Sequence, residues 1–536
     1  IIQYLDKTDD QTTLDDVEIT FENLKQNKLI YLDDIWYLFN NDELDENVFK
    51  NQENSLEATI NDVLKNNEEY KTFLIISSCL GYQFDLKVLS NATGLSLIET
   101  AKKIEEISFN TGIFESLPNP NNKIKFRNRA TLNALINIFS LNNDLENIPL
   151  TQRTCCFTAA TALKNSQNDF ALESERIFNL FEKSGYNYIE QIFYSGLDLI
   201  GNLCVLNQFE KASIIANKCQ NYLKNYNGNK YNKLLNDISV EKYFIQFEKV
   251  FHSGLKDNGS ITNLLDNWFD LDNYKIKLIY PAMRTLYNTR EYPKLVKFIK
   301  DLKQEKELPD WLVYDIDHYS ALVEIYYNQN KELGKKLLLK CINKLKDQKD
   351  DDHLAVSSRI FTSFGNNYPK EKITESLIIK SIEIKEMLSD KPGLARSYGS
   401  LTRMYFEKEP TSTKVLESCN NWLKLNKELN DVFGIIMSKN YMGKIYFNLH
   451  KLNNSNKNNL DKSKKCYFEN IKYIKQNIDD GSKIQIFTSY ADLMEIAKYE
   501  KDEKSYSDYS EELFSLIKNF GKIENKFFKN IFEKAF

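Results

Sequence analysis

The feature that most constrains this chain is an internal repeat at an offset of 41 residues, between positions 393 and 447. Five positions of the first copy are matched in the second: Gly393 by Gly434, Ser397 by Ser438, Leu401 by Met442, Tyr405 by Tyr446 and Phe406 by Phe447. The first four matches are spaced by four residues, which places them near one stripe of an α-helix. A helical unit that recurs along a chain buries its apolar stripe against its neighbours, so we expect a stack of repeats.

Small residues elsewhere indicate helical hairpins of about 40 residues. Two sets are spaced by four and then three positions: Ala212, Ala216 and Cys219, and Gly334, Leu338 and Cys341. In tetratricopeptide-like repeats such residues lie where the second helix approaches its neighbours closely, and Gly201 lies where the first helix carries its glycine. From 141 to 536 we therefore expect a right-handed α-solenoid of about nine helical pairs, with a concave surface that suits recognition rather than catalysis.

The composition favours a mainly all-α protein. Glycine and proline number only 17 and 9 among 536 residues, well below average shares of about 7% and 5%. The 71 basic and 76 acidic residues give a net charge of −5, which provides no overall attraction to nucleic acid or to an anionic membrane. No stretch approaches about 18 uninterrupted apolar residues, so we expect no membrane span and a cytoplasmic location.

The eight cysteines are scattered and form no C-x-x-C pair. We interpret them as buried free thiols of a reducing cytosol rather than as disulfides. The adjacent Cys155 and Cys156 could form a redox pair, but core filling is favoured, because neighbouring positions on a helix do not face each other. The chain begins with Ile1 and has no signal peptide, so we expect it to be part of a longer protein.

The first 80 residues combine predicted helices with a pair of strands. A helix is predicted over 12–27, and two short strands over 29–32 and 35–39. We interpret residues 1–50 as the remnant of a preceding helix and wing element. A helical stretch over 55–80 follows, with Gly81 as its C-cap.

Residues 84–127 carry the signals of two helices and a wing. A short helix over 84–90 is closed by Asn91 and Gly94, and Ser96 with Glu99 forms a capping box for a helix over 97–109. Two short strands, 112–115 and 123–127, then flank a connection rich in proline and asparagine. Three helices followed by a two-stranded wing predict a winged-helix domain over 51–140.

The chain lacks the motifs of the common catalytic and metal sites. It contains no G-x-x-x-x-G-K-[ST], no G-x-S-x-G and no H-E-x-x-H. None of its four histidines lies near a cysteine at zinc spacing, and the acidic run at 349–352 lacks the glycine and glutamate of a calcium loop. We therefore expect no catalytic residue, no metal and no cofactor held by this chain, and no enzymatic activity of its own.

A predicted winged helix raises the question of DNA binding. The segment that would enter the groove, 96–110, carries two lysines but three glutamates. Neutralisation of phosphates requires a basic surplus at this position. We therefore do not expect nucleic-acid binding, and favour packing of this domain on protein.

The segment at 73–86, FLIISSCLGYQFDL, resembles the winged-helix segment that follows the nucleotide-binding core in large signalling ATPases of the STAND and AAA classes. The shared pattern is an apolar helix with small residues, then Cys-hydrophobic-Gly and Phe-Asp-Leu. It is most similar to the ATPase modules of hybrid serine/threonine-kinase–histidine-kinase proteins, and related modules occur in bacterial cyclases and maltose-type activators. Residues 21–24, 29–31 and Trp36 fit the helix and strands that precede this domain in the family.

This resemblance implies a regulatory role in signal transduction. In the family a nucleotide-binding domain precedes the winged helix and a helical repeat region follows it. Asn128, within 126–130, stands where the family carries a histidine that is thought to touch the nucleotide, which puts nucleotide sensing by this copy in doubt. ATP or ADP would then bind a neighbouring domain outside this chain. We expect that restoring histidine at Asn128 leaves the stability nearly unchanged.

Three functions stay open at the level of sequence. The first is the ligand-sensing segment of a larger signal-transduction ATPase, which binds a protein or small effector on the solenoid and controls a nucleotide-binding domain. The second is a free-standing helical-repeat adaptor, and the third is the central segment of a sensor histidine kinase. Tyr326 and Tyr327 are candidate contacts, whereas Tyr405 and Tyr446 belong to the repeat and are expected to be structural. Oligomer formation on activation is also left open.

Overall fold

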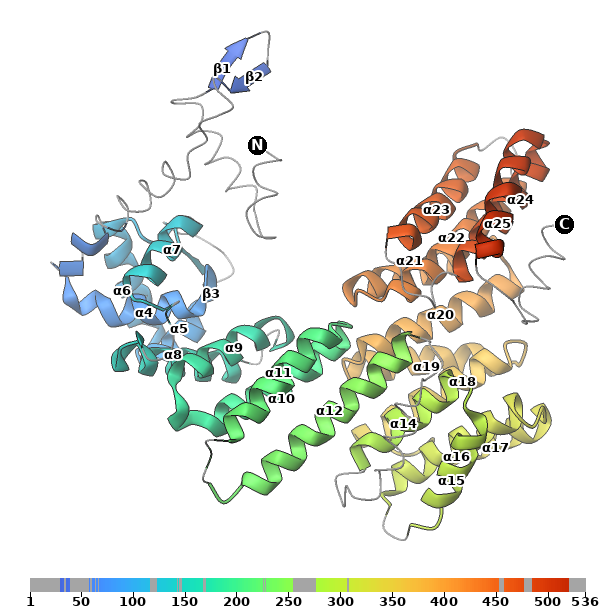
Figure 1. Cartoon of the computed structure of the whole chain (residues 1–536), viewed down its shortest axis with the longest axis horizontal. Coiled ribbons are helices and arrows are strands. Elements are labelled where there is room, and N and C mark those ends of the chain that lie inside the picture. Colours follow the sequence, from blue (N-terminus) through green and yellow to red (C-terminus); the bar gives the residue numbers. More distant parts are fainter. Residues whose placement is uncertain are drawn as a thin grey trace. The chain divides into compact units, whose positions relative to one another are not determined.

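A computed structural model describes residues 29–32, 35–38 and, with short gaps, 57–115, 123–253, 276–476 and 484–519 (Figure 1). The chain divides into two compact units, Ile1–Leu199 with Lys218–Gly228, and Ile200–Asn217 with Asn229–Phe536. Helices dominate both units, as the scarcity of glycine and proline predicts.

A strand pair lies near the start of the first unit. Strands β1 (Leu29–Leu32) and β2 (Ile35–Leu38) are antiparallel, with Leu29 opposite Leu38 and Leu32 opposite Ile35. This confirms the two predicted strands. The helix predicted over 12–27 lies outside the described residues.

The helix predicted over 55–80 is interrupted. Described positions between 57 and 65 are helical, a 3-10 turn follows at η1 (Glu68–Tyr70), and α4 (Lys71–Leu80) begins after it. Gly81 ends α4 with φ +94°, which confirms the predicted cap. The guanidinium of Arg176 lies against Gly81, 2.6 Å from where a Cβ would stand, and it donates a hydrogen bond to the Leu80 carbonyl at 2.7 Å.

The next segment begins as a strand rather than as the helix predicted over 84–90. Strand β3 (Gln83–Asp85) pairs antiparallel with β4 (Lys123–Lys125). Helix α5 (Leu86–Thr93) starts only after Asp85, whose carboxylate accepts a hydrogen bond from the Lys87 amide at 2.7 Å. Helix α6 (Leu97–Thr111) carries the predicted capping box of Ser96 and Glu99.

The predicted wing strands pair with each other. The Glu115 amide donates to the Lys125 carbonyl at 3.0 Å, and the Arg127 amide donates to the Ile113 carbonyl at 2.9 Å. The rings of Phe84, Phe114 and Phe126 pack together beneath them, with centroids 5.0 to 6.4 Å apart. The elements expected of a winged helix are thus present in order, and assignment of the region to that fold stays a prediction.

The first unit also contains the first helical hairpin of the array. Its remaining elements are α7 (Arg129–Ile138), α8 (Leu150–Asn165), α9 (Phe170–Ser184), η3 (Tyr186–Tyr188), the start of α10 (Ile189–Val205) and the end of α11 (Phe209–Leu223). Helix α8 packs on α4 and α5 as well as on α9. The division between the compact units therefore lies further along the chain than residue 141, where the sequence predicts the solenoid to begin.

The cysteines are free thiols, and seven of the eight are buried. The two that approach each other are Cys79 and Cys156, with sulfur atoms 3.7 Å apart, rather than the adjacent Cys155 and Cys156. They lie on α4 and α8, so this contact is part of the packing between those helices.

The second unit stacks helical pairs in series. Its elements are the end of α10, the start of α11 (Phe209–Leu223), α12 (Tyr231–Ser253), α14 (Ile276–Asn288), α15 (Tyr292–Leu302), α16 (Asp310–Tyr326), α17 (Lys331–Leu345), α18 (Asp351–Asn367), α19 (Thr374–Met387), α20 (Lys391–Lys408), α21 (Thr413–Glu428), α22 (Val432–Leu452), α23 (Lys457–Gln476), α24 (Ile484–Glu500) and α25 (Glu503–Asn519). From α14 to α25 consecutive helices pack as pairs, and the first helix of each pair also contacts the first helix of the next. This is the predicted α-solenoid of helical hairpins.

The small residues of the second helices lie where the sequence predicts, but the glycine of the first helix does not. A Cβ on Gly334 would stand 3.0 Å from the Ala321 carbonyl, which confirms a close approach of α17 to α16. Among the described residues no atom lies within 4 Å of the Cβ position of Gly201, so the close packing expected of a first-helix glycine is not found there. Gly196, five residues earlier, is the glycine of α10 that packs against Cys219.

Candidate functional site

The second unit contains a cavity of about 700 Å³. Most of its lining comes from first helices of successive pairs, namely α10, α12, α14, α18, α20 and α22, with α21 contributing from the second helices. Its charged lining residues are Arg284, Arg359, Arg396, Arg403, Glu248, Asp390 and Asp431. Its aromatic lining residues are Phe244, Phe251, Tyr280, Trp422 and Phe433.

The basic residues of this cavity are all of one type. Only nine of the 71 basic residues of the chain are arginine. Four of these nine line the cavity, and no lysine occurs among its lining residues in the described part of the unit. The lining therefore differs sharply in composition from the rest of the chain.

Two of the four arginines are held by buried carboxylates. Arg284 pairs with Glu248, and Arg359 Nη2 donates to the fully buried Asp315 at 2.6 Å. Burial by itself would raise the pKa of Asp315, but the charges and hydrogen bonds of Arg359 and His318 outweigh it and hold the pKa below its usual range. Arg359 also stacks on Tyr280, 4.1 Å from the ring centroid.

The other two arginines, Arg396 and Arg403, lie exposed on α20. Arg403 Nε donates to the Gly399 carbonyl of its own helix at 3.3 Å. Neither arginine forms an ion pair with the residues that the structure describes. At the repeat offset of 41 their counterparts are Met437 and Lys444, so the two copies share their packing residues but differ at these positions.

The carboxylates that line the cavity at the starts of α20 and α22 already have hydrogen-bond partners. Asp390 accepts a hydrogen bond from the Gly393 amide at 2.8 Å, and Asp431 accepts one from the Gly434 amide at 2.9 Å. Each carboxylate thereby satisfies an amide in the first turn of α20 or α22 that has no partner within its helix. Their first role is therefore to start these helices.

A buried amide without a partner faces the same end of the cavity. Asn426 on α21 is 1% exposed, and neither its Oδ1 nor its Nδ2 has a hydrogen-bond partner among the residues that the structure describes. A Cβ on Gly434 would stand 2.5 Å from this amide. The amide thus occupies the space that a side chain at position 434 would need, and its burial without a partner costs free energy.

One hydrogen bond joins the two ends of the lining. The Nδ2 of Asn207 donates to the Leu429 carbonyl at 2.9 Å, across 222 positions of sequence. The cavity is therefore bounded by both early and late parts of the second unit.

A buried lysine lies behind the arginines of α20. Lys385 is 2% exposed, and its Nζ donates to Thr362 Oγ1 at 2.8 Å and to Ser397 Oγ at 2.7 Å. Burial and then the charge of Arg396 lower the pKa of Lys385 to about 7, although Asp390 acts in the opposite direction. This lysine changes its charge near neutral pH.

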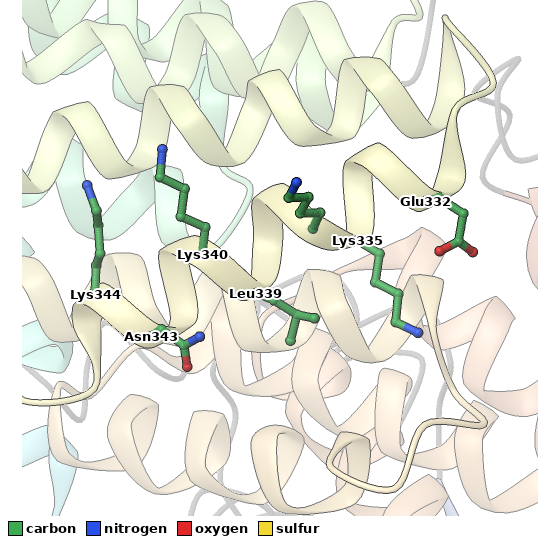
Figure 2. Close-up of a pocket in the computed structure, with 7 residues that line it drawn as sticks. Glu332, Lys335, Leu339, Lys340, Asn343 and Lys344 are labelled. Carbon is green, nitrogen blue, oxygen red and sulfur yellow. The ribbon is translucent and has the colours of Figure 1, made fainter.

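A second basic region lies on α17 and has a different geometry (Figure 2). Its lining residues all belong to this one helix and include Lys335, Lys340 and Lys344. Lys340 and Lys344 extend to one side of the helix, whereas Lys335 extends to the other (Figure 2). Because these ammonium groups diverge, they do not form a convergent site.

Asn128 has a structural role that the sequence did not reveal. Its side-chain oxygen accepts hydrogen bonds from the Thr131 amide at 2.8 Å and the Thr131 hydroxyl at 2.9 Å, and it is the N-cap of α7. Replacement by histidine removes this cap. In urea unfolding we therefore expect a cost of about 1 kcal/mol, in place of the nearly unchanged stability expected from sequence.

The tyrosines singled out from sequence pack on neighbouring helices. Tyr326 and Tyr327 are 45% and 47% exposed, and their ring centroids lie 5.6 Å from Tyr287 and 5.8 Å from Tyr292. Tyr405 and Tyr446 are partly buried and pack against apolar clusters of the solenoid. No sequence pattern indicates the arginine cavity, since its lining residues are dispersed over more than 230 positions.

Within the described residues, no group of three or more metal-ligating side chains comes together. Of the described helices, none is long and apolar enough to cross a bilayer.

Neither a family model nor a curated protein sequence matches this chain. Among solved structures it is similar to that of a Signal Transduction ATPase with Numerous Domains (STAND) protein with a tetratricopeptide repeat sensor from Pyrococcus horikoshii. The match has 12% sequence identity and a TM-score of 0.44, and it covers 89% of this chain. This chain spans 66% of the length of that protein, which is less than two thirds.

Proposed function

We propose that this chain is the ligand-sensing segment of a larger signal-transduction ATPase, and that the cavity of the second unit is where the ligand binds. The observation that carries the proposal is the cavity itself, which unites arginines, aromatic rings and an unpartnered amide from helices far apart in sequence. Ligand sites are typically concave and combine apolar walls with a few convergent polar groups.

The regulatory part of the proposal is supported by the resemblance at 73–86 to the winged-helix segment of signalling ATPases. The ATPase domain would lie outside this chain, and so would any bound ATP or ADP. A ligand controls such a domain only if it binds one state more tightly than the other. A change from about 1:99 to 99:1 requires a preference of roughly 5.5 kcal/mol.

Helix α6 supports a protein-contacting role for the first unit over DNA binding. It exposes large apolar side chains, with Leu97, Ile98 and Phe109 at 49%, 69% and 92%. Exposed apolar side chains of this size are more typical of protein contacts than of a phosphate-binding surface. We propose that this helix packs on protein.

The experiment uses the full-length protein. The first step is to read the gene upstream of Ile1 for a phosphate-binding loop and to assay nucleotide hydrolysis by the whole protein. Ala355 lines the cavity, so Ala355→Trp should fill it and remove the response of hydrolysis to ligand. The matched control is Asp352→Trp on the exposed side of the same helix, α18, and should keep the response.

Two outcomes would contradict the proposal. A full-length protein without a nucleotide-binding domain would favour the helical-repeat adaptor, and a downstream histidine-kinase domain would favour the sensor kinase. If Ala355→Trp and Asp352→Trp reduced the response equally, the cavity would not be the ligand site.

A further inference from the structure

The lining of the cavity contains arginine in a chain that otherwise uses lysine. Lysine would supply the same charge, so charge alone does not account for the four arginines among the lining residues. The guanidinium differs in its planar set of donors, which matches two oxygens of a phosphate or carboxylate, and in its ability to stack on aromatic rings. The residue type therefore points to an oxyanion.

Two of these arginines serve the fold and two are available to a ligand. Arg284 and Arg359 are occupied by Glu248 and Asp315. Arg396 and Arg403 are seven residues apart on α20, which places them on one face and about 10 Å apart along the axis. A guanidinium has five N–H donors, and Arg403 uses one of its five on the Gly399 carbonyl.

The carboxylates nearby do not neutralise this pair fully. Asp390 and Asp431 each cap a helix, as their hydrogen bonds to Gly393 and Gly434 show. Burial raises the pKa of Asp431, while the Gly434 amide and the charge of Arg396 act in the opposite direction. An incoming anion would supply acceptors for the remaining N–H donors of Arg396 and Arg403.

Asn426 provides an independent indication of a ligand. Its amide is 1% exposed and lines the cavity, and within the described part of the chain neither of its polar atoms has a hydrogen-bond partner. Buried amides of native proteins are nearly always satisfied, and an exception requires a water, an ion or a ligand. Asn426 packs closely on Gly434 and is open to a ligand through the cavity that both residues line.

The dimensions favour a small molecule over a peptide. The volume of about 700 Å³ lies within the usual range of small-molecule sites, roughly 300–1,000 Å³. The hydrogen bond from Asn207 to Leu429 joins the two ends of the lining, whereas an extended peptide needs an open groove. Aromatic side chains such as Tyr280 and Trp422 offer surfaces for a planar or apolar body.

We propose that the cavity binds a small organic anion whose phosphate or carboxylate group is held by Arg396 and Arg403, with Asn426 as a further hydrogen-bonding group. This inference rests on the proposed function in that it takes the cavity as the ligand site. The body of the ligand lies against the aromatic lining.

The experiment measures binding of named anions to the 536-residue chain by calorimetry and thermal shift. The probes are AMP, glucose 6-phosphate, citrate and inorganic phosphate, with adenosine as an uncharged comparison and a hexaglutamate peptide as an extended one. We expect at least one anion to bind saturably, and the double variant Arg396→Gln/Arg403→Gln to bind it roughly 10- to 100-fold more weakly. Both arginines are exposed, so the variant should fold as the wild type does, which circular dichroism checks.

The matched control is Lys340→Gln/Lys344→Gln on α17, which removes the same charge from a surface with no convergent site. It should bind the probe as the wild type does. Arg396→Lys keeps the charge but loses the planar fork, and it should weaken binding measurably. Binding of inorganic phosphate alone would mean that the body of the ligand makes no contribution, and would overturn the organic part of the proposal.

Other outcomes would overturn the inference outright. These are the absence of binding by any anion, equal losses in the arginine and lysine variants, or tighter binding of a hexaglutamate peptide than of every small anion. Failure of the proposed function can be distinguished from failure of the anion site. If an anion binds through Arg396 and Arg403 but does not alter nucleotide hydrolysis by the full-length protein, the sensing role fails and the anion site stands.

Discussion

Two basic regions of the second unit show that the number of positive charges does not make a site. On α17 the lysines extend from a single helix in different directions (Figure 2). Lys335 pairs with the half-exposed Glu371 at 2.6 Å. In the cavity, four arginines approach one volume from three helices, α14, α18 and α20. The first arrangement suits a solvated surface, whereas the second places donors where a ligand can use several at once.

The largest expected difference in stability is between variants of the two carboxylates that pair with Arg359 and Lys335. Asp315 is fully buried against Arg359, so Asp315→Ala leaves a guanidinium without its partner in a poorly solvated position. We expect a loss of about 3–5 kcal/mol in the free energy of unfolding. Glu371→Ala breaks the partly exposed pair with Lys335 and should cost at most about 1 kcal/mol. Urea unfolding of both variants, compared by the shift of the midpoint, measures the difference.

Restoration of the buried charge balance provides the control for this contrast. If Asp315→Ala destabilises because Arg359 is left charged and unpaired, then Arg359→Met in the same chain should recover part of the loss. Equal effects of Asp315→Ala and Glu371→Ala would mean that the cavity arginines are as well solvated as the lysines of α17.

The next contrast is between the lysine behind the cavity and the lysines of α17. Lys385 has a pKa of about 7 when folded and near 10.5 when unfolded. Between these values the unfolded chain holds a proton that the folded chain lacks, so stability rises with pH by about 1.4 kcal/mol per unit. Below pH 7 the lysine is charged in both states, and this gain is absent.

The measurement is the difference in unfolding free energy between the wild type and Lys385→Met from pH 7 to 8.5. Taking the difference cancels the contributions of other titrating groups. The stability of the wild type relative to the variant should rise across this range, whereas Lys340→Met on the exposed face of α17 should give a flat difference. A flat difference for Lys385→Met as well would show that Lys385 stays charged in the folded state.

The sequence predicts the framework of the molecule because the framework depends on local signals. The capping box of Ser96 and Glu99 and the close approach at Gly334 are set by neighbouring residues or by helical spacing. Helical hairpins were evident from periodicity. The strand at 83–85 was missed because it pairs with residues 123–125, some 40 positions later, and has no alternating pattern of its own.

The site could not be predicted, since it depends on which helices face one another. Arg284 and Arg396 are 112 positions apart, and Asn207 meets Leu429 only in the folded unit. The turns are also hidden, because several use non-glycine residues with positive φ, such as Ser389 at +55° and Asn430 at +52°. These two turn residues themselves lie 41 positions apart, so an analysis of the repeat could have found them.

The third prediction is a substitution in the cavity that should tighten the binding of anions. Asp431 is the lining carboxylate whose charge acts on Arg396. Asp431→Asn removes that competitor and keeps an oxygen that can cap α22. We expect the anionic probes to bind about fivefold more tightly, as one unit charge at the effective dielectric of a partly buried site is worth roughly 1 kcal/mol or more. Glu332→Gln on α17 is the matched change and should leave calorimetric binding unaltered.

The smallest expected effect is on the lysine face itself. Lys340 and Lys344 are exposed, and neither has an ion pair with the residues described around α17. Lys340→Gln/Lys344→Gln should therefore change the free energy of unfolding by no more than about 0.5 kcal/mol. Solvated charges of this kind contribute through long-range repulsion, which salt screens, so any change should vanish at high ionic strength. A loss of several kcal/mol that persisted in salt would show that α17 holds a partner, and would remove the distinction between the two basic regions.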